Sequence, residues 1–393
     1  MTHHSLPRPW AQRVDSIAPF RVMELLGKAK QLERQGRDII HMEIGEPDFI
    51  TPKAIVAAAE QALQQGKTHY TPALGLPELR ERIALHYVES YGVRISPKQV
   101  VITAGASGAL LLAAALLVNP GQSLLMADPG YPCNRHFLQL VGGESVMVPV
   151  EADNDYALTP ALVKQYWQAN SCGILLASPA NPTGGILTSS QLSALSETVR
   201  YYQGWMIVDE IYHGLTYGDP ITTALSCHAD AIIINSFSKY YGMTGWRLGW
   251  MVVPEALIEG LEKLAQNYFI APSTVAQYAA LAAFSPAAQE EMEDRRRAFQ
   301  ARRDYLLPAL RSLGFSINHC PQGAFYLYAG AERFTQESYP FCLELLEKAG
   351  VAVTPGIDFG HHRTQQSIRF AYTTSLPRLH EGVERIAGFL QKL

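Results

Sequence analysis

Short apolar runs alternate with helix-like segments between residues 100 and 239. The runs occupy residues 100–103, 123–127, 173–177, 205–208 and 231–234. Helix starts are predicted between them at Thr159-Pro160 and at Thr188, where Gln191 completes a capping box. Buried strands of parallel sheets form continuous apolar runs and are joined by helices. The pattern therefore predicts an α/β fold with a mostly parallel sheet covered by helices on both faces.

Each apolar run is followed by residues that can take part in chemistry. Ligands of open α/β sheets bind at the carboxyl ends of the strands, which lie along one edge. We therefore expect one site that collects, in chain order, Ala106, Ser107, Tyr131, Asn181, Asp209, Tyr212, Ser236 and Lys239.

The stretch AIIINSFSKYYGMTGWRLGW, residues 231–250, presents a lysine just after a buried strand. Most lysines lie at the surface, and Lys239 could be one of them. The alternative is a lysine that forms a Schiff base, whose pKa is lowered by burial or by a cationic neighbour. Arg247 follows in the same stretch and could supply both the charge and a planar fork for a phosphate.

Pyridoxal phosphate is a cofactor that would use these strand ends. It needs a lysine for its aldehyde, an acid for its pyridine nitrogen, a phosphate cradle and a stacking partner for its ring. Asp209 suits the nitrogen, Tyr131 the ring face, and Tyr212 and Asn181 the phenolic oxygen. The cradle would comprise Ala106, Ser107, Ser236, Ser238 and Arg247. Singly, Asp209 could instead cap a helix, Asn181 could occupy a turn and Tyr131 could lie in the core.

The two chain ends are predicted to form a second, smaller unit. A chain of 393 residues exceeds a single hydrophobic core, so we expect two domains. The expected division is an N-terminal arm with part of the small domain (1–45), a large cofactor-binding domain (46–275) and a C-terminal small α+β domain (276–393). Further predicted elements are a strand over 39–44, strands over 324–328 and 367–371, and helices over 20–35, 77–91, 285–313, 339–350 and 376–393, with another helix capped by Thr51 and ended by Gly66.

Composition narrows the possible partners. The formal net charge is −4, which disfavours nucleic acid, and the arginine-rich helix over 285–313 is expected to present a solvated face of mixed charge. The most apolar run (109–118) is too short to cross a bilayer, and the N-terminus lacks the apolar core of a signal peptide. Five cysteines without a CxxC pair indicate neither a disulfide framework nor a zinc site. We therefore expect a cytoplasmic protein without a membrane partner.

Two other motifs carry less weight. Gly66-Lys67-Thr68 is similar to the end of a phosphate-binding P-loop, but Gln61 stands where that motif requires glycine. The pairs His3-His4 and His361-His362 lack the spacing of a metal-binding motif. Neither a P-loop nucleotide-binding protein nor a metal site is expected.

Several motifs occur in an order that resembles one family. SPANPTGG, VDEIY and SFSKYYGMTGWRLGW, with IGEPDF, HYTPALG, TAGASGAL, DPGYP and SIRFAY, look like the class I and II pyridoxal-phosphate aminotransferases of the aspartate aminotransferase fold type. The resemblance covers the chain from about residue 17 onward. It implies a large cofactor-binding domain and a smaller α+β domain. It also implies ping-pong transfer of an amino group from an L-amino acid to a 2-oxo acid.

The resemblance implies roles for individual residues. Lys239 matches the Schiff-base lysine and proton shuttle, and Arg369 the clamp on the substrate α-carboxylate. Tyr70 matches a tyrosine that reaches the phosphate of a neighbouring subunit, which implies a homodimer with shared sites. The remaining matches are Asp209 for the pyridine nitrogen, Asn181 and Tyr212 for the phenolic oxygen, Asn181 also for the substrate, Tyr131 for the ring, Ala106, Ser107, Ser236 and Arg247 for the phosphate, Gly45 beside the carboxylate and Phe20 over the substrate.

Alternatives within the same fold stay open. Carbon–sulfur lyases and aminocyclopropane-carboxylate synthases would use the same lysine, aspartate and arginines. A non-enzymatic regulator would need a DNA-binding segment, and the N-terminal arm is short and not basic. Ser107 leaves the helix start uncharged, which favours neutral, aliphatic or aromatic donors over acidic ones, with pyruvate or 2-oxoglutarate as acceptor.

Overall fold

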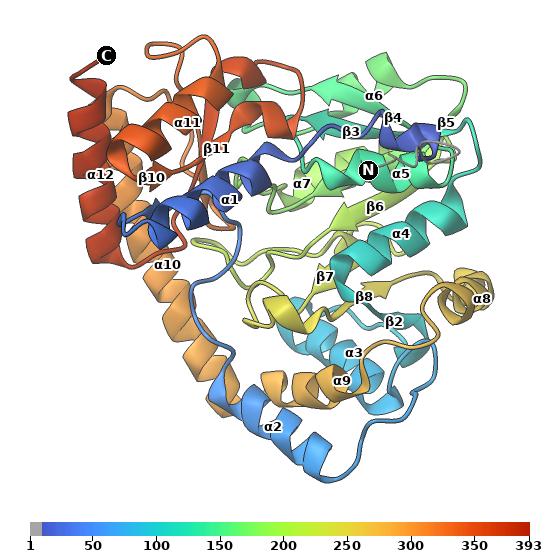
Figure 1. The fold of residues 1–393 in the computed structure, drawn as a ribbon. Helices are drawn as coiled ribbons and strands as arrows, with labels where there is room; N and C mark the ends of the chain where they lie inside the picture. The colour runs from blue at the N-terminus through green and yellow to red at the C-terminus, as the bar shows by residue number, and fades with distance from the viewer. Residues whose placement is uncertain (1–9) are drawn as a thin grey trace, which may run out of the picture.

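The computed structural model describes residues 10–393. Pro7, Pro9 and the His3-His4 pair of the expected arm lie outside the described residues. The larger part of the molecule is a seven-stranded sheet between two layers of helices, and the smaller part joins residues 21–41 to the C-terminal elements (Figure 1).

The sheet confirms the predicted parallel topology. Its spatial order is β2-β8-β7-β6-β5-β3-β4. Among the described strands of this sheet, β8 alone runs against its neighbours β2 and β7. The carboxyl ends of the other six strands therefore meet at one edge. The bounds are β2 (Val100–Thr103), β3 (Ser123–Asp128), β4 (Glu144–Pro149), β5 (Ser171–Ala177), β6 (Trp205–Asp209), β7 (Ile232–Ser236) and β8 (Gly249–Val252).

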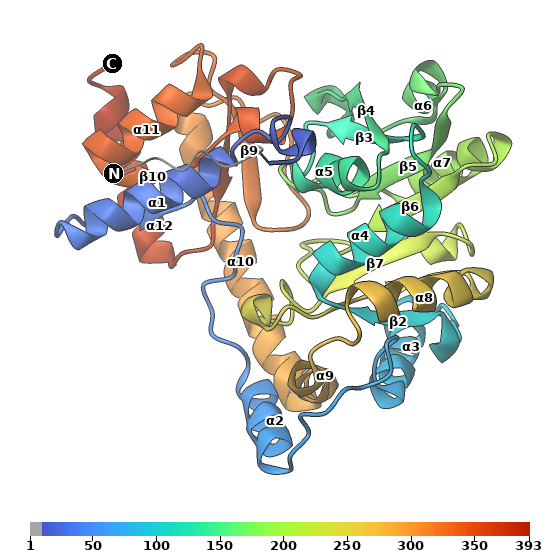
Figure 2. The same cartoon turned by 45° about the vertical axis from the view of Figure 1, so that its right-hand side comes forward.

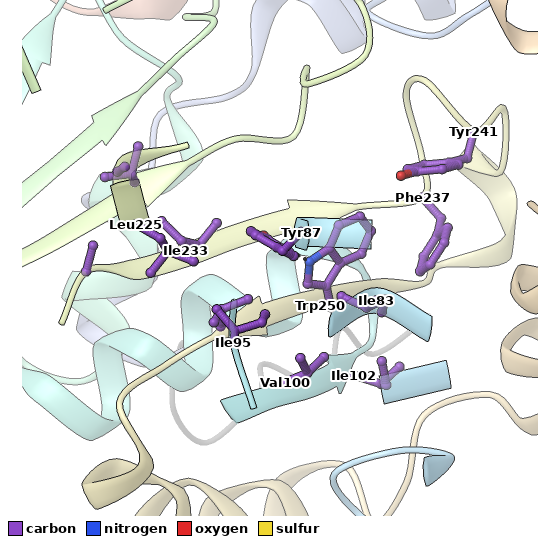
Figure 3. Packing of buried hydrophobic residues seen from close by; sticks show 14 of the residues in the cluster. Ile83, Tyr87, Ile95, Val100, Ile102, Leu225, Ile233, Phe237, Tyr241 and Trp250 are labelled. Carbon is purple, nitrogen blue, oxygen red and sulfur yellow. Dashed lines mark hydrogen bonds between the residues drawn. The ribbon is translucent and has the colours of Figure 1, made fainter. Parts of the chain in front are cut away.

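Successive strand residues enter two different core clusters because side chains alternate across a sheet. Ile233 and Trp250 pack on one face with Tyr87, and Phe237 and Tyr241 extend this aromatic group (Figure 3). That face is covered by α2 (Lys53–Gln64), α3 (Pro77–Tyr91), α6 (Pro160–Tyr166), α7 (Ser189–Tyr201) and α9 (Thr274–Leu281). The opposite face is covered by α4 (Gly105–Leu117), α5 (Cys133–Leu140) and α8 (Ile258–Tyr268).

A third cluster forms the core of the smaller part. Helix α10 (Pro286–Leu313) links the two parts, because it contacts α2 at one end and α12 at the other (Figure 2). The cluster joins residues from both chain ends. Its elements are α1 (Arg21–Arg34), β1 (Ile40–His41), β9 (Tyr326–Gly330), α11 (Ser338–Ala349), β10 (Val351–Ala352), β11 (Thr354–Pro355), β12 (Ser367–Ala371) and α12 (Leu376–Leu390). The boundaries at residues 45 and 275 stay a prediction.

Local predictions near the N-terminus needed correction. The strand expected over 39–44 is the two-residue β1, paired with β10. Thr51 does not cap a helix. Its hydroxyl instead donates to the Gly242 carbonyl at 2.9 Å and accepts from Trp246 Nε1 at 2.9 Å, while Pro52 precedes α2. By contrast, Thr159 and the Thr188–Gln191 capping box start α6 and α7 as predicted.

The arginines of α10 do not all lie on a solvated face. Arg297 does, with 59% of its side chain exposed. Arg302 and Arg303 are buried, and Arg302 forms a two-pronged ion pair with Asp48 at 2.7 and 2.9 Å. These buried arginines tie α10 to neighbouring segments. Within residues 10–393, no helix is long and apolar enough to span a bilayer.

Candidate active site

A cavity of about 250 Å³ lies at the carboxyl edge of the sheet, where it meets α1 and β12. With one exception, it brings together the residues that the sequence predicted for the site. The predicted residues that line it are Phe20, Gly45, Ala106, Ser107, Tyr131, Asn181, Asp209, Tyr212, Ser236, Ser238, Lys239, Arg247 and Arg369.

Lys239 and Asp209 supply the opposite charges of this cavity. Lys239 follows β7 and its Nζ donates to the Gly45 carbonyl at 2.6 Å. Burial lowers the pKa of Lys239 to about 8, against the opposing effect of Glu46. Asp209 ends β6, and burial raises the pKa of its carboxyl to about 7, although the Ile211 N–H and Lys239 both favour the ionised form. At neutral pH both groups are therefore close to a change of protonation.

Arg247 and the start of α4 form a positively polarised corner. The N-cap residue of α4, Ala104, offers no side-chain acceptor, so the N–H groups of the first turn stay open toward the cavity. Arg247 lies against this turn, since a Cβ on Gly105 would come within 2.7 Å of its Nη2. Arg247 itself has a positive φ of 55°, an uncommon conformation outside glycine. Such a corner suits an anion such as a phosphate.

Two hydroxyl groups complete this corner. Ser236 Oγ donates to Ser238 Oγ at 2.9 Å, and Arg247 Nη1 reaches Ser238 Oγ at 3.5 Å. Both serines are buried at the end of β7. They therefore add hydrogen-bonding groups beside the guanidinium.

Arg369 projects from the central strand of the small sheet and is held from two sides. Its Nη1 donates to Asn181 Oδ1 at 2.8 Å, and its Nη2 donates to the Glu43 carbonyl at 2.7 Å. Its Nε is a buried donor without a protein partner. Its guanidinium also lies 4.3 Å from the centre of the Tyr326 ring. A buried, positioned guanidinium with an unused N–H is suited to a carboxylate ligand.

Tyr326 belongs to the site, although the sequence analysis did not identify it. Its hydroxyl lies 2.9 Å from that of Tyr212, and both side chains are buried. A Cβ on Gly45 would overlap the Tyr326 hydroxyl, so this approach requires glycine at position 45. An aromatic residue in the middle of a predicted strand was the only available signal, and it is too common to identify a site.

Two other predicted residues occupy distinct walls. Tyr131 follows β3 and is half-buried, and burial raises its pKa. Phe20 immediately precedes α1 and is also half-buried. The α1 wall contains further apolar residues, Val22 and Met23, that the sequence analysis missed.

Tyr70 does not lie in this cavity. It sits in the loop between α2 and α3, and 82% of its surface is exposed. Its predicted role requires a neighbouring subunit, so within one chain the structure does not bring it to the site.

The fold and this arrangement of groups define a class I or II aminotransferase, and the chain belongs to that family. The family described as aminotransferase class I and II matches residues 37–386. The chain is 37% identical to the valine–pyruvate aminotransferase of Mycobacterium tuberculosis, over 95% of this chain and 97% of that protein. It is 36% identical to the aspartate aminotransferase of Geobacillus stearothermophilus, over 97% of this chain and 98% of the other.

Solved structures show the same fold. An aminotransferase from Mycobacterium tuberculosis superposes with a TM-score of 0.94 at 36% identity, over 98% of this chain and all of the other. The aspartate aminotransferase of Thermus thermophilus with maleate gives a TM-score of 0.92 at 31% identity, over 97% of this chain and 99% of the other. The protein is an aminotransferase, and nothing in these comparisons favours the alternative of a carbon–sulfur lyase.

Proposed function

We propose that this aminotransferase uses pyridoxal phosphate to move an amino group from an L-amino acid to a 2-oxo acid by a ping-pong mechanism. The observation that carries the proposal is the meeting of Lys239, Asp209, Arg247 and Arg369 in one cavity. Lys239, Asp209 and Arg247 come from the ends of strands or from loops beside them, and Arg369 comes from the middle of β12. Each offers a function that the proposed chemistry requires.

The residues present fit the cofactor. The open first turn of α4, Arg247 and Ser236 would hold its phosphate. Asp209 would accept a hydrogen bond from the pyridine N–H. Its carboxyl lies buried at the cavity wall, and the hydrogen bond from Ile211 N at 3.1 Å occupies only Oδ1. Further contacts are Tyr131 on the ring face, with Asn181 and Tyr212 at the phenolic oxygen. When bound, pyridoxal phosphate supplies an aldehyde for the amino group and a ring that accepts electrons from Cα.

The chain's own residues carry the remaining steps. Arg369 binds the α-carboxylate of the donor through its forked N–H groups and so fixes which Cα bond faces Lys239. Lys239 Nζ would hold the cofactor aldehyde before the donor arrives, and its lowered pKa keeps a useful fraction of free amine near neutral pH. Once free, the same amine would take the proton from the donor Cα and give it to the adjoining carbon of the cofactor.

Asp209 and Tyr212 support this proton transfer. With its pKa raised to about 7 by burial, Asp209 ionises readily when a cationic ring nitrogen approaches. Tyr212 keeps its proton, because burial raises its pKa well above the usual range, so it can donate a hydrogen bond. The Tyr326 hydroxyl lies 2.9 Å from that of Tyr212. In the proposed complex Tyr326 would donate to Tyr212, which leaves the Tyr212 proton for the phenolic oxygen.

Exposed Tyr70 supports a homodimer with shared sites. In a dimer its hydroxyl would reach the phosphate of the partner subunit, which explains why a polar aromatic residue stands exposed on the loop. Replacing Tyr70 by Phe should weaken cofactor affinity about tenfold, the effect of one lost hydrogen bond to a charged group. Tyr201, 78% exposed, provides the control, because Tyr201→Phe should change nothing. Equal affinities for both variants, or a monomer in sedimentation, would contradict the dimeric site.

A cytoplasmic location is the environment we infer. All five cysteines are free, and they are distributed over the sheet and the smaller part. A chain that keeps its cysteines as thiols is suited to a reducing compartment.

Half-reactions test the proposed activity. The purified holoenzyme should lose the absorbance of the bound aldehyde when an amino acid is added alone and recover it when a 2-oxo acid follows. Cysteine-type donors should give no pyruvate unless a 2-oxo acid acceptor is consumed. Pyruvate formed without an acceptor would indicate a lyase, and an unchanged spectrum with a panel of donors would refute the transfer.

A further inference from the structure

The cavity has one wall without charge. It is formed by Phe20, Val22 and Met23 at the start of α1, and Leu110 from α4 and Ile211 after β6 add further apolar surface to the cavity. The cations of the described lining are Lys239, Arg247 and Arg369. Each already has a task in the proposed chemistry, so the lining that this chain itself supplies leaves no cation for a second carboxylate of the donor.

The α1 wall is held in place by a carboxylate from far along the chain. Phe20 is the N-cap residue of α1 and provides no capping side chain. Asp358 caps the helix instead. Its Oδ1 accepts a hydrogen bond from Arg21 N and its Oδ2 accepts one from Val22 N, each at 2.9 Å. Asp358 is 5% exposed and lies in the short 3-10 helix Gly356–Phe359. A carboxylate at a helix start is also favoured by the helix dipole.

The segment that carries Asp358 is itself anchored to the sheet. Asp128, at the end of β3, accepts from His361 N at 3.0 Å and from His362 N at 3.2 Å. A Cβ on Gly360 would overlap the Asp128 carboxylate, so only glycine allows this approach. The Phe359 carbonyl accepts from Gly130 N at 2.8 Å. Residues 358–362 therefore connect the sheet edge to the first turn of α1, with hydrogen bonds to both.

The same segment also contacts the arginine at the other end of the substrate site. The Phe359 ring centre lies 4.8 Å from the Arg369 guanidinium. Residues 356–362 thus touch both the residue that would bind the α-carboxylate and the wall that faces the donor side chain.

We propose that the site takes amino donors with apolar side chains and that Asp358 is the positioning residue that fixes the α1 wall against them. This inference rests on the proposed function and adds the class of donor. Val22 and Met23 give the donor side chain an apolar surface, and Asp358 sets how far that surface stands from Arg369. A loose α1 would leave the α-carboxylate clamp in place while the side-chain contact is lost.

The test measures kcat and KM for alanine, valine, leucine, phenylalanine and aspartate. The wild-type enzyme should favour a larger apolar donor over alanine by about 10- to 200-fold in kcat/KM, the range expected for added methylene groups in an apolar pocket. In Asp358→Ala this preference should shrink at least about fivefold through a raised KM for the larger donors, and Asp358→Asn should restore part of it. Asp294→Ala, on the exposed side of α10, is the matched control and should keep the wild-type preference.

A second variant keeps the inference testable if Asp358→Ala does not fold. Met23 is 54% exposed, so Met23→Lys should fold, and it would place a cation on the wall. It should lower kcat/KM for leucine and raise that for aspartate, each about tenfold. A wild-type preference for aspartate, or an equal loss with all donors in Asp358→Ala, would overturn the inference while leaving transamination intact. Absence of turnover with every donor would instead count against the proposed function.

Discussion

The strand-end wall of the cavity and the α1 wall are held by different kinds of interaction. Lys239 and Asp209 are placed by the sheet itself, because each follows directly from a buried parallel strand. The start of α1 is placed by Asp358, whose contact with Arg21 spans 337 residues of sequence. Chemistry is therefore built on the rigid part of the fold. In our proposal, recognition of the donor side chain depends on the two long-range hydrogen bonds that Asp358 accepts from Arg21 N and Val22 N.

The largest expected effect falls on the strand-end wall. Lys239→Ala should lower kcat by about 10⁴-fold, because it removes the amine that moves the proton. The variant should keep its fold and bind the cofactor without a covalent bond. Lys263→Ala is the control, because Lys263 is exposed and paired only with Glu259 on α8. Stopped-flow half-reactions provide the measurement, and near-normal transfer by Lys239→Ala would refute the assignment.

Asp209→Asn should lower activity and stabilise the apoenzyme above neutral pH. Activity should fall about 10²- to 10³-fold, because an amide cannot balance the charge of the ring nitrogen. Burial raises the folded-state pKa of Asp209 to about 7, from 3.8. The folded state therefore binds more protons than the unfolded state between these values, so its stability falls as the pH rises from about 4 to about 7 and then levels off.

Denaturant unfolding of the two apoproteins tests this sign. Between pH 4.5 and pH 8 the free energy of unfolding of the wild type should drop relative to Asp209→Asn by roughly 2–4 kcal/mol. If the difference in free energy of unfolding between the two proteins did not change with pH, the pKa of Asp209 would not be raised by burial.

Arg369 links the two walls, and its replacement should have an intermediate effect. Arg369→Lys keeps the charge but cannot maintain contacts to Asn181 and the Glu43 carbonyl while binding a carboxylate. We expect kcat/KM to fall about 10²-fold for donors and acceptors alike, since both carry the same carboxylate. Arg378→Lys is the control. Arg378 lies in a partly exposed ion pair with Asp38, so this variant should leave kcat/KM for donors and for acceptors unchanged. A loss confined to a single donor would contradict the clamp.

The smallest expected effect lies outside the cavity, in the smaller part of the fold. His41 contacts Glu43 at 2.7 Å and Glu33 at 3.0 Å, and the hydrogen bond that its ring donates to Glu43 is the main cause that raises the pKa of His41 to about 9. A raised pKa gives stability that is present below pH 6.5 and lost as the pH rises through about 9.

The variant His41→Gln measures this contribution. Because a third of the side chain is exposed, solvent screening reduces the contribution to about 1 kcal/mol. Thermal unfolding of both proteins at pH 6 and pH 9.5 should show the wild-type advantage only at the lower pH. An equal difference at both values would mean that the histidine acts through packing alone.

Sequence patterns were informative where structure is local. The alternating apolar runs predicted the sheet, and residues just after each run, such as Lys239 and Asp209, reached the cavity as expected. The edge strand β4 was missed because its residues, ESVMVP, are only partly buried and form no continuous apolar run. Capping was predicted correctly at Thr188, whose partner is three residues away.

Contacts between distant segments could not be predicted in this way. Thr51 was predicted to cap α2, but its hydroxyl donates a hydrogen bond to the Gly242 carbonyl instead. Asp358 lies in a short 3-10 helix, and nothing in the local sequence indicates that its carboxylate accepts hydrogen bonds from the first N–H groups of α1. Tyr326 reaches the site because Gly45, which is distant in the sequence, leaves space for its hydroxyl. Each of the three contacts joins segments that are far apart in the sequence.

The account depends most directly on the bond between Lys239 and the cofactor. Borohydride reduction of the holoenzyme, followed by proteolysis and mass spectrometry, would locate a phosphopyridoxyl group. The account predicts that this mass is carried by the peptide containing Lys239 and disappears when the enzyme is first treated with an amino donor. An unmodified Lys239 peptide, or label on another lysine, would contradict it.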